Sequence, residues 1–421
     1  GINNIVGVSG MFVGLVLGGL LAPIDWRLVF LISVPLGAFG TVWAYLKLEE
    51  RGVRRPAPVD WLGNLTFAVG LILIMVAITS AIRPYGSHTM GWTSPRVIVE
   101  AAVGLALLAA FGVVETRVAN PMFRLPLFRI RAFTCGAFSS FFAAVARGGL
   151  MFMLIIWLQG IWLPRHGYSF DRTPLWAGIC MLPLTLGFLL AGPVSGYLSD
   201  RYGARGFATG GMITSAASFA LLELLPIDFP YLLFALILLL NGLGMGTFAA
   251  PNRAGVMNSL PAEDRGAGGG MNQTFQNSAQ VLSVGIFFTL MVAGLAADLP
   301  RTMAAGLAAH GVAPAAATAA GHIPPVSILF AAFLGYNPIE HLLGPAALGH
   351  LSAANHAALT GRTFFPQLIS GPFQTGLHQA FAFAVVACLL AAAVSWSRGR
   401  RGVEDEIRAP GPARRELGAT P

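Results

Sequence analysis

The chain has 421 residues, of which 55% are hydrophobic and only 10% charged, and its formal net charge is +8. A soluble domain carries about 25% charged residues, so this composition excludes an ordinary soluble fold and indicates a membrane protein. The basic residues lie in loops beside apolar runs rather than in one patch, which argues against a nucleic-acid partner.

Ten apolar stretches are each near the roughly 20 residues that a helix needs to cross about 30 Å of hydrocarbon. Every backbone polar group in lipid needs an internal partner, so runs of this length are helices, and the predicted fold is an all-α, polytopic membrane protein. The predicted spans are, approximately, 1–22, 28–48, 61–82, 97–116, 133–162, 175–198, 207–226, 230–250, 272–296 and 378–396.

The short loops between these spans alternate between arginine-rich and arginine-poor, with twelve Lys or Arg in one set and five in the other. The rich set is 47–60, 117–131, 199–206 and 251–271, and the poor set is 23–27, 83–96, 163–174 and 227–229. Basic loops favour the cytoplasmic side, and an even number of spans returns the chain to the side where it began. The sequence therefore predicts a multi-pass protein of the cell membrane with both ends in the cytoplasm.

The loops also divide the chain into parts. Residues 1–50 hold two spans, 51–116 hold another pair and 117–397 hold six, before a polar tail at 398–421. An unusually long segment at 297–377 falls on the outer side by the same count, and its proline steps predict turns and short helices. A loop of this length is usually functional or partly disordered.

One charged string lies at the inner end of the sixth predicted span. It reads G-Y-L-S-D-R-Y-G-A-R and runs from Gly196 to Arg205. Gly196 permits close approach of two helices, Asp200 lies near helix termini and arginines, and Gly203 permits a sharp turn. Arg201 and Arg205 stay at the cytoplasmic interface. The alternative is an ordinary charged turn, but the complete string resembles a known family motif, and that resemblance implies a gating role.

Glycines recur through the first predicted span. Gly10, Gly14 and Gly18 are spaced four apart, and Gly19 follows directly. Residues four apart share one helix face, so these glycines permit close packing or bending. The alternative is simple helix packing, since glycine is frequent in membrane helices.

These strings carry a resemblance to a known family. The inner string resembles the cytoplasmic loop motif of the major facilitator superfamily, and the glycine repeat resembles the fifth-helix antiporter motif of its drug exporters. That motif usually has proline where this chain has Leu15, and Ser33 stands where the family's W-R…N-V-P stretch has asparagine. Trp157 to Gln159, Pro261 to Gly266 and Asn277 to Gly285 are similar to the drug:proton antiporter branch with about fourteen helices.

The resemblance implies an organisation and a function. Residues 1–50 would be the last two helices of an N-terminal bundle, 51–116 the central linker pair, and 117–397 the C-terminal six-helix bundle. The first four helices of that branch would then lie before Gly1, which is not a methionine. In this family the proton-binding carboxylates often come from those early helices. The implied partners are a small-molecule substrate, protons and the lipid bilayer.

Two charged residues are candidates for substrate binding or coupling. Arg147 is the one charge at the centre of a predicted span, and a guanidinium at that depth costs roughly 2.5–3.5 kcal/mol unless it faces water or a partner. It either binds an anionic group in a cavity or is held by helix carbonyls, and we lean slightly to the first. Asp25 is the second candidate, although a surface ion pair with Arg27 is the interpretation that we favour.

The ninth predicted span opens with a polar face. Asn272, Gln276, Gln280 and Ser283 follow the spacing i, i+4, i+8, i+11, which is one side of a helix. A polar face within a membrane helix points at a wet cavity or at a polar neighbour. We favour lining of a central cavity for part of this face over hydrogen bonds between helices.

The prediction that follows is a secondary transporter working by alternating access, most simply an exporter of small hydrophobic or cationic compounds driven by proton entry. The alternatives are a non-transporting remnant or misannotated gene start, and an importer of the same fold. The sequence contains no Walker lysine loop and no zinc spacing among its eight histidines. We therefore expect no enzyme, no cofactor and no metal site.

Overall fold

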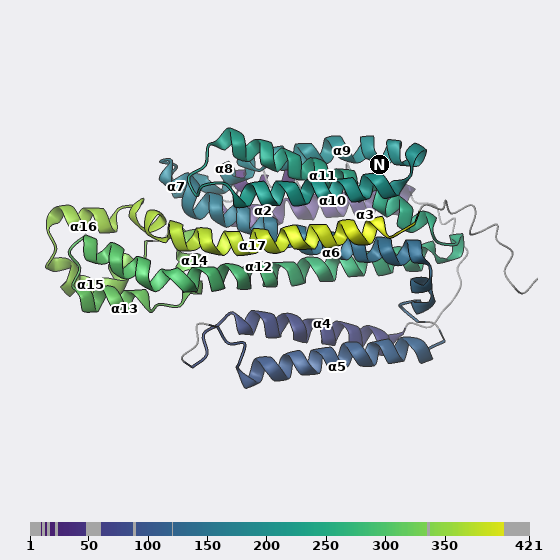
Figure 1. The fold of residues 1–421 in the computed structure, drawn as a ribbon, viewed down its shortest axis with the longest axis horizontal. Helices are drawn as coiled ribbons and strands as arrows, with labels where there is room; N and C mark the ends of the chain where they lie inside the picture. Colours follow the sequence, from purple (N-terminus) through teal and green to yellow (C-terminus); the bar gives the residue numbers. More distant parts are fainter. Residues whose placement is uncertain are drawn as a thin grey trace, which may run out of the picture.

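The computed structural model describes residues 10, 13–14, 17–21, 24–47, 60–86, 90–119, 121–334 and 337–399. Across these ranges the molecule is built from helices, and the long ones run side by side along its longest axis (Figure 1). Eight helices of the described part are long and apolar enough to cross a membrane, and the bent pair α13 and α14 is a ninth candidate. The predicted all-α membrane fold is confirmed.

The N-terminal third contributes one span, made of α2 (Trp26–Leu31) and α3 (Ser33–Lys47), and one helix pair. α2 and α3 cover the span predicted at 28–48, whereas the span predicted at 1–22 falls partly outside the described residues. α4 (Trp61–Ala81) and α5 (Pro95–Arg117) form a hairpin that lies beside the remaining helices, with α4 against α12 (Figure 1). We call α4 and α5 the linker hairpin.

The linker hairpin is close-packed at its middle because glycines face each other there. A Cβ added to Gly104 would lie 2.9 Å from the carbonyl oxygen of Gly70, and one added to Gly70 would lie 3.1 Å from the carbonyl oxygen of Gly104. Small residues of this kind let helix backbones approach closely inside a membrane, where dispersion contacts rather than hydrophobic exclusion hold helices together.

The rest of the chain forms one helical bundle around a common apolar core. Its largest fully buried side chains include Trp157, Phe219, Phe287 and Phe381. Its elements are η1 (Leu125–Arg129), α6 (Arg131–Trp157), η2 (Leu158–Trp162), α7 (Leu163–Arg165), η3 (Phe170–Arg172), α8 (Thr173–Cys180), α9 (Leu182–Tyr202), α10 (Ala204–Glu223), α11 (Tyr231–Asn258), η4 (Ala262–Asp264), α12 (Arg265–Ala309), α13 (Pro314–Gly321), α14 (Pro325–Leu334), α15 (Ile339–Gly349), α16 (Ala353–Thr360) and α17 (Phe364–Trp396).

The long outer segment predicted at 297–377 differs from a loop. α12 continues to Ala309 and α17 begins at Phe364, so both penetrate the segment, and α13 to α16 fill the remainder. Figure 1 shows α13, α15 and α16 gathered at one end of the molecule, while α14 packs against α12 and η2. The helices run past the boundaries at 296 and 378 because hydropathy marks only the apolar part of a helix. The added part of α12 is alanine-rich, which favours helix, whereas the added part of α17 is not.

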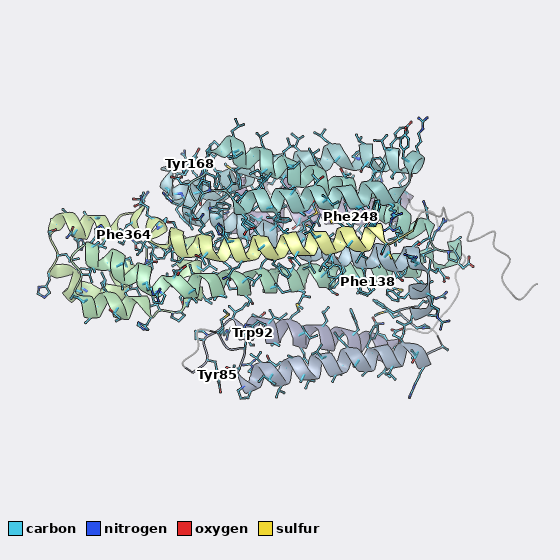
Figure 2. All side chains as sticks on the ribbon, in the orientation of Figure 1. Tyr85, Trp92, Phe138, Tyr168, Phe248 and Phe364 are labelled. Carbon is cyan, nitrogen blue, oxygen red and sulfur yellow. The ribbon has the colours of Figure 1, made fainter. Side chains whose placement is uncertain are left out.

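The connections between helices divide between the two ends of the molecule as predicted from the arginine pattern. One end holds the α5–α6, α9–α10 and α11–α12 connections and the end of α17, and the opposite end holds the α4–α5 connection and α13, α15 and α16 (Figure 1). Tyr85 and Trp92 mark the second end, and Phe138 lies toward the first (Figure 2). We call the end with α9–α10 the basic end.

Candidate functional site

Arg147 lies near the middle of the long α6 to α7 span and is exposed on the surface of the bundle. Among the residues that the structure describes, its guanidinium forms no hydrogen bond or ion pair. It is therefore not held by helix carbonyls of its own bundle. A free guanidinium at this depth must meet water or a group on another element, and the role of Arg147 in binding or coupling stays a prediction.

The helix around Arg147 is joined to α12 by a serine hydroxyl. Ser283 Oγ accepts a hydrogen bond from the backbone N–H of Gly149 at 2.8 Å and donates one to the carbonyl oxygen of Val145. In an α-helix these two backbone groups ordinarily bond each other, so the hydroxyl joins α12 to both partners of one rung of the backbone ladder of α6. The two helices are close here because a Cβ on Gly148 would lie 2.7 Å from the Gln280 carbonyl oxygen.

The polar face predicted on α12 is divided between two environments. Asn272 and Ser283 are buried inside the bundle, with exposed fractions of 4% and 0%. Gln280 is exposed, and Gln276 is half-buried between these extremes. Neighbouring helices therefore cover the part of the face with Asn272 and Ser283 and leave Gln280 uncovered.

Gln280 lines a hollow between the linker hairpin and the bundle. The hollow has a volume of about 760 Å³ and is walled by α4, α6, α12 and α14. A second hollow of about 600 Å³ continues it along α4 and α12. Their walls are mainly apolar, with amide groups from Asn277 and Gln280 and charged groups from Arg83 and Arg96. This size and lining suit a small hydrophobic ligand with a few polar groups. Arg147 does not line either hollow.

The charged string at the basic end forms the turn between α9 and α10. Gly203 has a φ of +89°, the left-handed region that glycine adopts without strain, so its predicted role in a sharp turn is confirmed. A Cβ on Gly196 would lie 3.6 Å from the Ala250 Cβ, an ordinary contact. Asp200 and Arg201 are exposed, and Asp200 has no partner among the described residues. Arg205 stacks on the Trp396 ring, 3.9 Å from its centroid.

A polar network ties the end of α17 to α6 and α11 at the same end. Arg398, which the sequence placed in the polar tail, instead turns inward and its Nη2 contacts Asn252 Oδ1. Asn252 Nδ2 donates to Ser140 Oγ at 2.7 Å and to the Gly136 carbonyl at 3.1 Å. Burial lowers the pKa of the Arg398 guanidinium. The network fixes three helix ends together, and small Gly136 and Gly255 leave the space that the guanidinium fills.

The remaining predicted site residues have plainer surroundings. Asp25 is the N-cap of α2, where its Oδ1 accepts a hydrogen bond of 2.9 Å from the Arg27 backbone N–H. The ion pair expected between their side chains is not formed in the described structure; Arg27 stands over the Trp26 ring instead. As the N-cap, the Asp25 carboxylate satisfies a backbone N–H of the first turn of α2, which an ion pair with Arg27 would leave without a partner. This explains why Asp25 caps the helix.

The glycines of the first predicted span differ among themselves. A Cβ added to Gly10, Gly14 or Gly18 would meet nothing within 4 Å, whereas one on Gly19 would lie 2.9 Å from the Leu175 Cα. Gly19 thus permits a close approach to α8. Gly10, Gly14 and Gly18 have no such neighbour among the described residues, so their role in close helix packing stays a proposal.

Two carboxyl groups escaped the sequence analysis. Asp60 and Glu115 lie at the basic end of the linker hairpin and are nearly completely buried. The sequence signal was weak, because each stands at the edge of a predicted span, where acidic residues are ordinarily solvated. Among the described residues, no group of three or more His, Cys, Asp or Glu side chains is arranged to hold a metal ion.

Comparison with known proteins places this architecture in a family. The family model of the Major Facilitator Superfamily matches residues 1–284. The chain belongs to the Major Facilitator Superfamily. Members of this family are transporters rather than enzymes, and the helices, the α6 and α12 surface and the α9–α10 turn are those of a chain of this family.

Several curated relatives of this major facilitator have names that state a function. The tetracenomycin C resistance and export protein of Streptomyces glaucescens is 27% identical over 415 residues, which are 97% of this chain and 69% of the relative. The puromycin resistance protein of Streptomyces alboniger is 28% identical over 75% of this chain and 59% of its own length. An MFS-type transporter of Bacillus subtilis, YhcA, is 28% identical over 68% of this chain.

This major facilitator spans only part of these relatives. It covers 52% of the Bacillus subtilis transporter and 59% of the puromycin resistance protein. The relatives share its family at identities below 30%, and two of their names concern resistance. The functions that these names state belong to those proteins.

Proposed function

We propose that this major facilitator exports small, mainly hydrophobic compounds in exchange for protons by alternating access. The observation that carries the proposal is the pair of adjoining hollows between the linker hairpin and the bundle. Their volumes of about 760 and 600 Å³, apolar walls and scattered amides match a site that selects by shape and hydrophobicity. Relatives whose names concern drug resistance support the same direction of transport.

The charge of the hollows narrows the substrate class. The charged side chains that line them are Arg83 and Arg96, and Arg96 is paired with Glu100 at 2.7 Å. A basic lining disfavours a cation, so neutral compounds fit these hollows better than the cationic compounds that the sequence also suggested. Arg147, exposed at mid-span, adds a place for an anionic group or for a carboxylate of another element.

The α9–α10 turn has a separate part in this proposal. Asp200 is exposed with no described partner, although it stands where charges of two helix ends meet. We infer that Asp200 and Arg201 contact another element when the basic end closes. Arg205, stacked on Trp396, keeps the turn joined to α17 in the present state.

Transport is tested with everted membrane vesicles from cells that express the complete reading frame. Export in the cell becomes uptake in everted vesicles, so a neutral fluorescent dye should accumulate when respiration acidifies the vesicle interior. A protonophore should abolish the accumulation. Accumulation in right-side-out vesicles instead would show an importer, and no gradient-dependent flux in either orientation would contradict the proposal.

Arg147→Ala tests the site within the same assay. Losing the exposed charge should lower gradient-dependent dye flux by about tenfold, since one lost charge-assisted contact is worth roughly 1.5 kcal/mol. Arg147→Lys should retain part of the flux. Arg129→Ala removes an exposed arginine from η1 and is the matched control, with flux expected at the level of the unmodified protein. Equal flux in Arg147→Ala and the control would leave Arg147 without a role.

A further inference from the structure

Two acidic side chains are buried together where the linker hairpin joins the bundle. Asp60 precedes α4 and is 8% exposed, and Glu115 lies in the last turn of α5 and is 4% exposed. Acidic residues are almost never buried to this degree without a partner. The pair therefore requires a physical explanation.

Each carboxyl group has one satisfied and one unsatisfied oxygen. Asp60 Oδ1 accepts the backbone N–H of Gly63 at 2.8 Å, and Glu115 Oε2 accepts the backbone N–H of Phe123 at 2.9 Å. Asp60 Oδ2 and Glu115 Oε1 are fully enclosed and have no hydrogen-bond partner in the described structure. Buried oxygens without a hydrogen-bond partner are costly.

The two unsatisfied oxygens face the same small space. A Cβ added to Gly63 would lie 2.9 Å from Glu115 Oε1 and closer still to Asp60 Oδ2. Only a residue without a side chain leaves room for both oxygens at this point. Gly63 therefore lets the two carboxyl groups meet.

Among the described residues, the basic groups of the neighbouring elements do not neutralise the pair. Arg117 on α5 and Arg129 on η1 are exposed. Arg124 contacts Asp264, and Arg265 at the start of α12 donates to the Leu260 carbonyl at 3.4 Å. Of the described residues, none provides a cation to either carboxyl group, and the charged group that acts on Glu115 is Asp60.

We propose that Asp60 and Glu115 bind one proton between Asp60 Oδ2 and Glu115 Oε1. A shared proton makes one carboxyl group the donor and the other the acceptor, which satisfies both orphaned oxygens with a single hydrogen bond. Two ionised carboxylates in this enclosure would instead repel each other, and neighbouring carboxylates elsewhere share a proton for this reason. The proposal does not depend on which compound the protein transports or on the direction of transport.

The proton would fasten the linker hairpin to the connection that leads into α6. Glu115 binds the Phe123 backbone, and the Phe123 ring packs against Phe67, Phe111 and Phe275 at centroid distances of 5.7, 5.4 and 6.0 Å. These rings come from α4, α5 and α12, so they join the hairpin to the bundle. Loss of the proton would drive the two carboxylates apart. Because Glu115 stays bonded to the Phe123 backbone, its displacement would pull the Phe123 ring from its contacts and loosen the wall of the adjoining hollow, to which Phe67 contributes.

Hydrogen exchange of the peptide that covers 118–130 tests the proposal in the full chain in detergent micelles. After correction for the intrinsic exchange rate, protection of this peptide should fall by about tenfold or more between about pH 5 and about pH 9. In Asp60→Asn and Glu115→Gln an amide donates in place of the proton, so protection should stay high at every pH. An unmodified protein with flat protection, or variants that keep its pH profile, would overturn the proposal.

Two further comparisons distinguish a shared proton from tight packing alone and from a bound metal cation. Gly63→Ala should displace the pair and lower protection at every pH, whereas Gly112→Ala, where a Cβ on α5 meets nothing within 4 Å, should match the unmodified protein. The infrared band of a protonated carboxyl group should be present at neutral pH and weaker in Asp60→Asn and Glu115→Gln. Protection restored at high pH by sodium chloride but not by choline chloride would identify a bound cation and overturn the proton assignment.

Discussion

At the scale of single residues, the hydroxyl of Ser283 bonds both the Gly149 N–H and the Val145 carbonyl in the middle of α6. Its replacement by alanine leaves the Val145 carbonyl and the Gly149 N–H without their present partner. We expect Ser283→Ala to lower the free energy of unfolding in detergent by about 1–2 kcal/mol. Ser278→Ala, on the same helix and without a hydrogen bond among the described side chains, should change it by less than about 0.5 kcal/mol.

Thermal unfolding of the two variants beside the unmodified protein checks this prediction. If Ser283→Ala were as stable as Ser278→Ala, the backbone of α6 would have closed its own hydrogen bond, and the Ser283 hydroxyl would contribute nothing. Direct bonding between the Gly149 N–H and the Val145 carbonyl is the ordinary arrangement in a helix, so equal stability of the two variants is the alternative that the experiment must exclude.

Residue patterns predicted the polar face of α12 but not which of its side chains are covered, and they missed the buried carboxyl pair. The spacing of Asn272, Gln276, Gln280 and Ser283 identified a polar helix face, but a single helix does not reveal which neighbours cover it. Packing against α6 buries Ser283, and Gln280 stays open. The Asp60 and Glu115 pair was beyond such reasoning, because it depends on how the two ends of a hairpin meet.

At the scale of helices, α11 packs between α9 and α10 through glycines. A Cβ on Gly242 would strike the Leu184 carbonyl oxygen of α9, and one on Gly244 would lie 2.7 Å from the Ser215 backbone nitrogen of α10. Backbone atoms cannot rotate away as a flexible side chain can, so overpacking here pushes whole helices apart.

Gly242→Ala should therefore lower the free energy of unfolding by about 1–3 kcal/mol. Gly210→Ala is the control, since a Cβ at that position of α10 meets nothing within 4 Å and alanine favours helix. Chemical unfolding in mixed micelles measures both. A Gly242→Ala protein as stable as the control would mean that α9 and α11 lie further apart than the structure has them.

Helix positions were more predictable than helix ends. Hydrophobic runs located α4, α5, α6, α9, α11 and α17 because lipid leaves a spanning backbone no alternative to helix. α10 also lies at a predicted span, although it is not among the helices apolar enough to count as a membrane span on composition. Outside the bilayer that constraint ends, so the extension of α12 to Ala309 and the start of α17 at Phe364 depend on tertiary packing that hydropathy does not record.

At the scale of the whole molecule, α12 is too long for a bilayer. Its 45 residues extend about 68 Å at 1.5 Å per residue, more than twice the roughly 30 Å of hydrocarbon. The excess projects at the end opposite the α9–α10 turn, together with α13, α15 and α16 (Figure 1). If the basic end faces the cytoplasm, as the arginine-rich loops favour, this cap of short helices must lie outside the cell.

Cysteine labelling in intact cells tests that orientation. Ala357 on α16 and Arg201 at the basic end are both exposed, and the natural Cys180 and Cys388 are buried, so Cys135→Ser supplies a background with little reactivity. A membrane-impermeant maleimide should label Ala357→Cys directly and Arg201→Cys only after the membrane is opened. An odd number of crossings must separate the two ends of α12, so labelling of both positions from the same side would contradict the arrangement of the helices. A reversed labelling pattern would leave the fold intact and invert only its direction in the membrane.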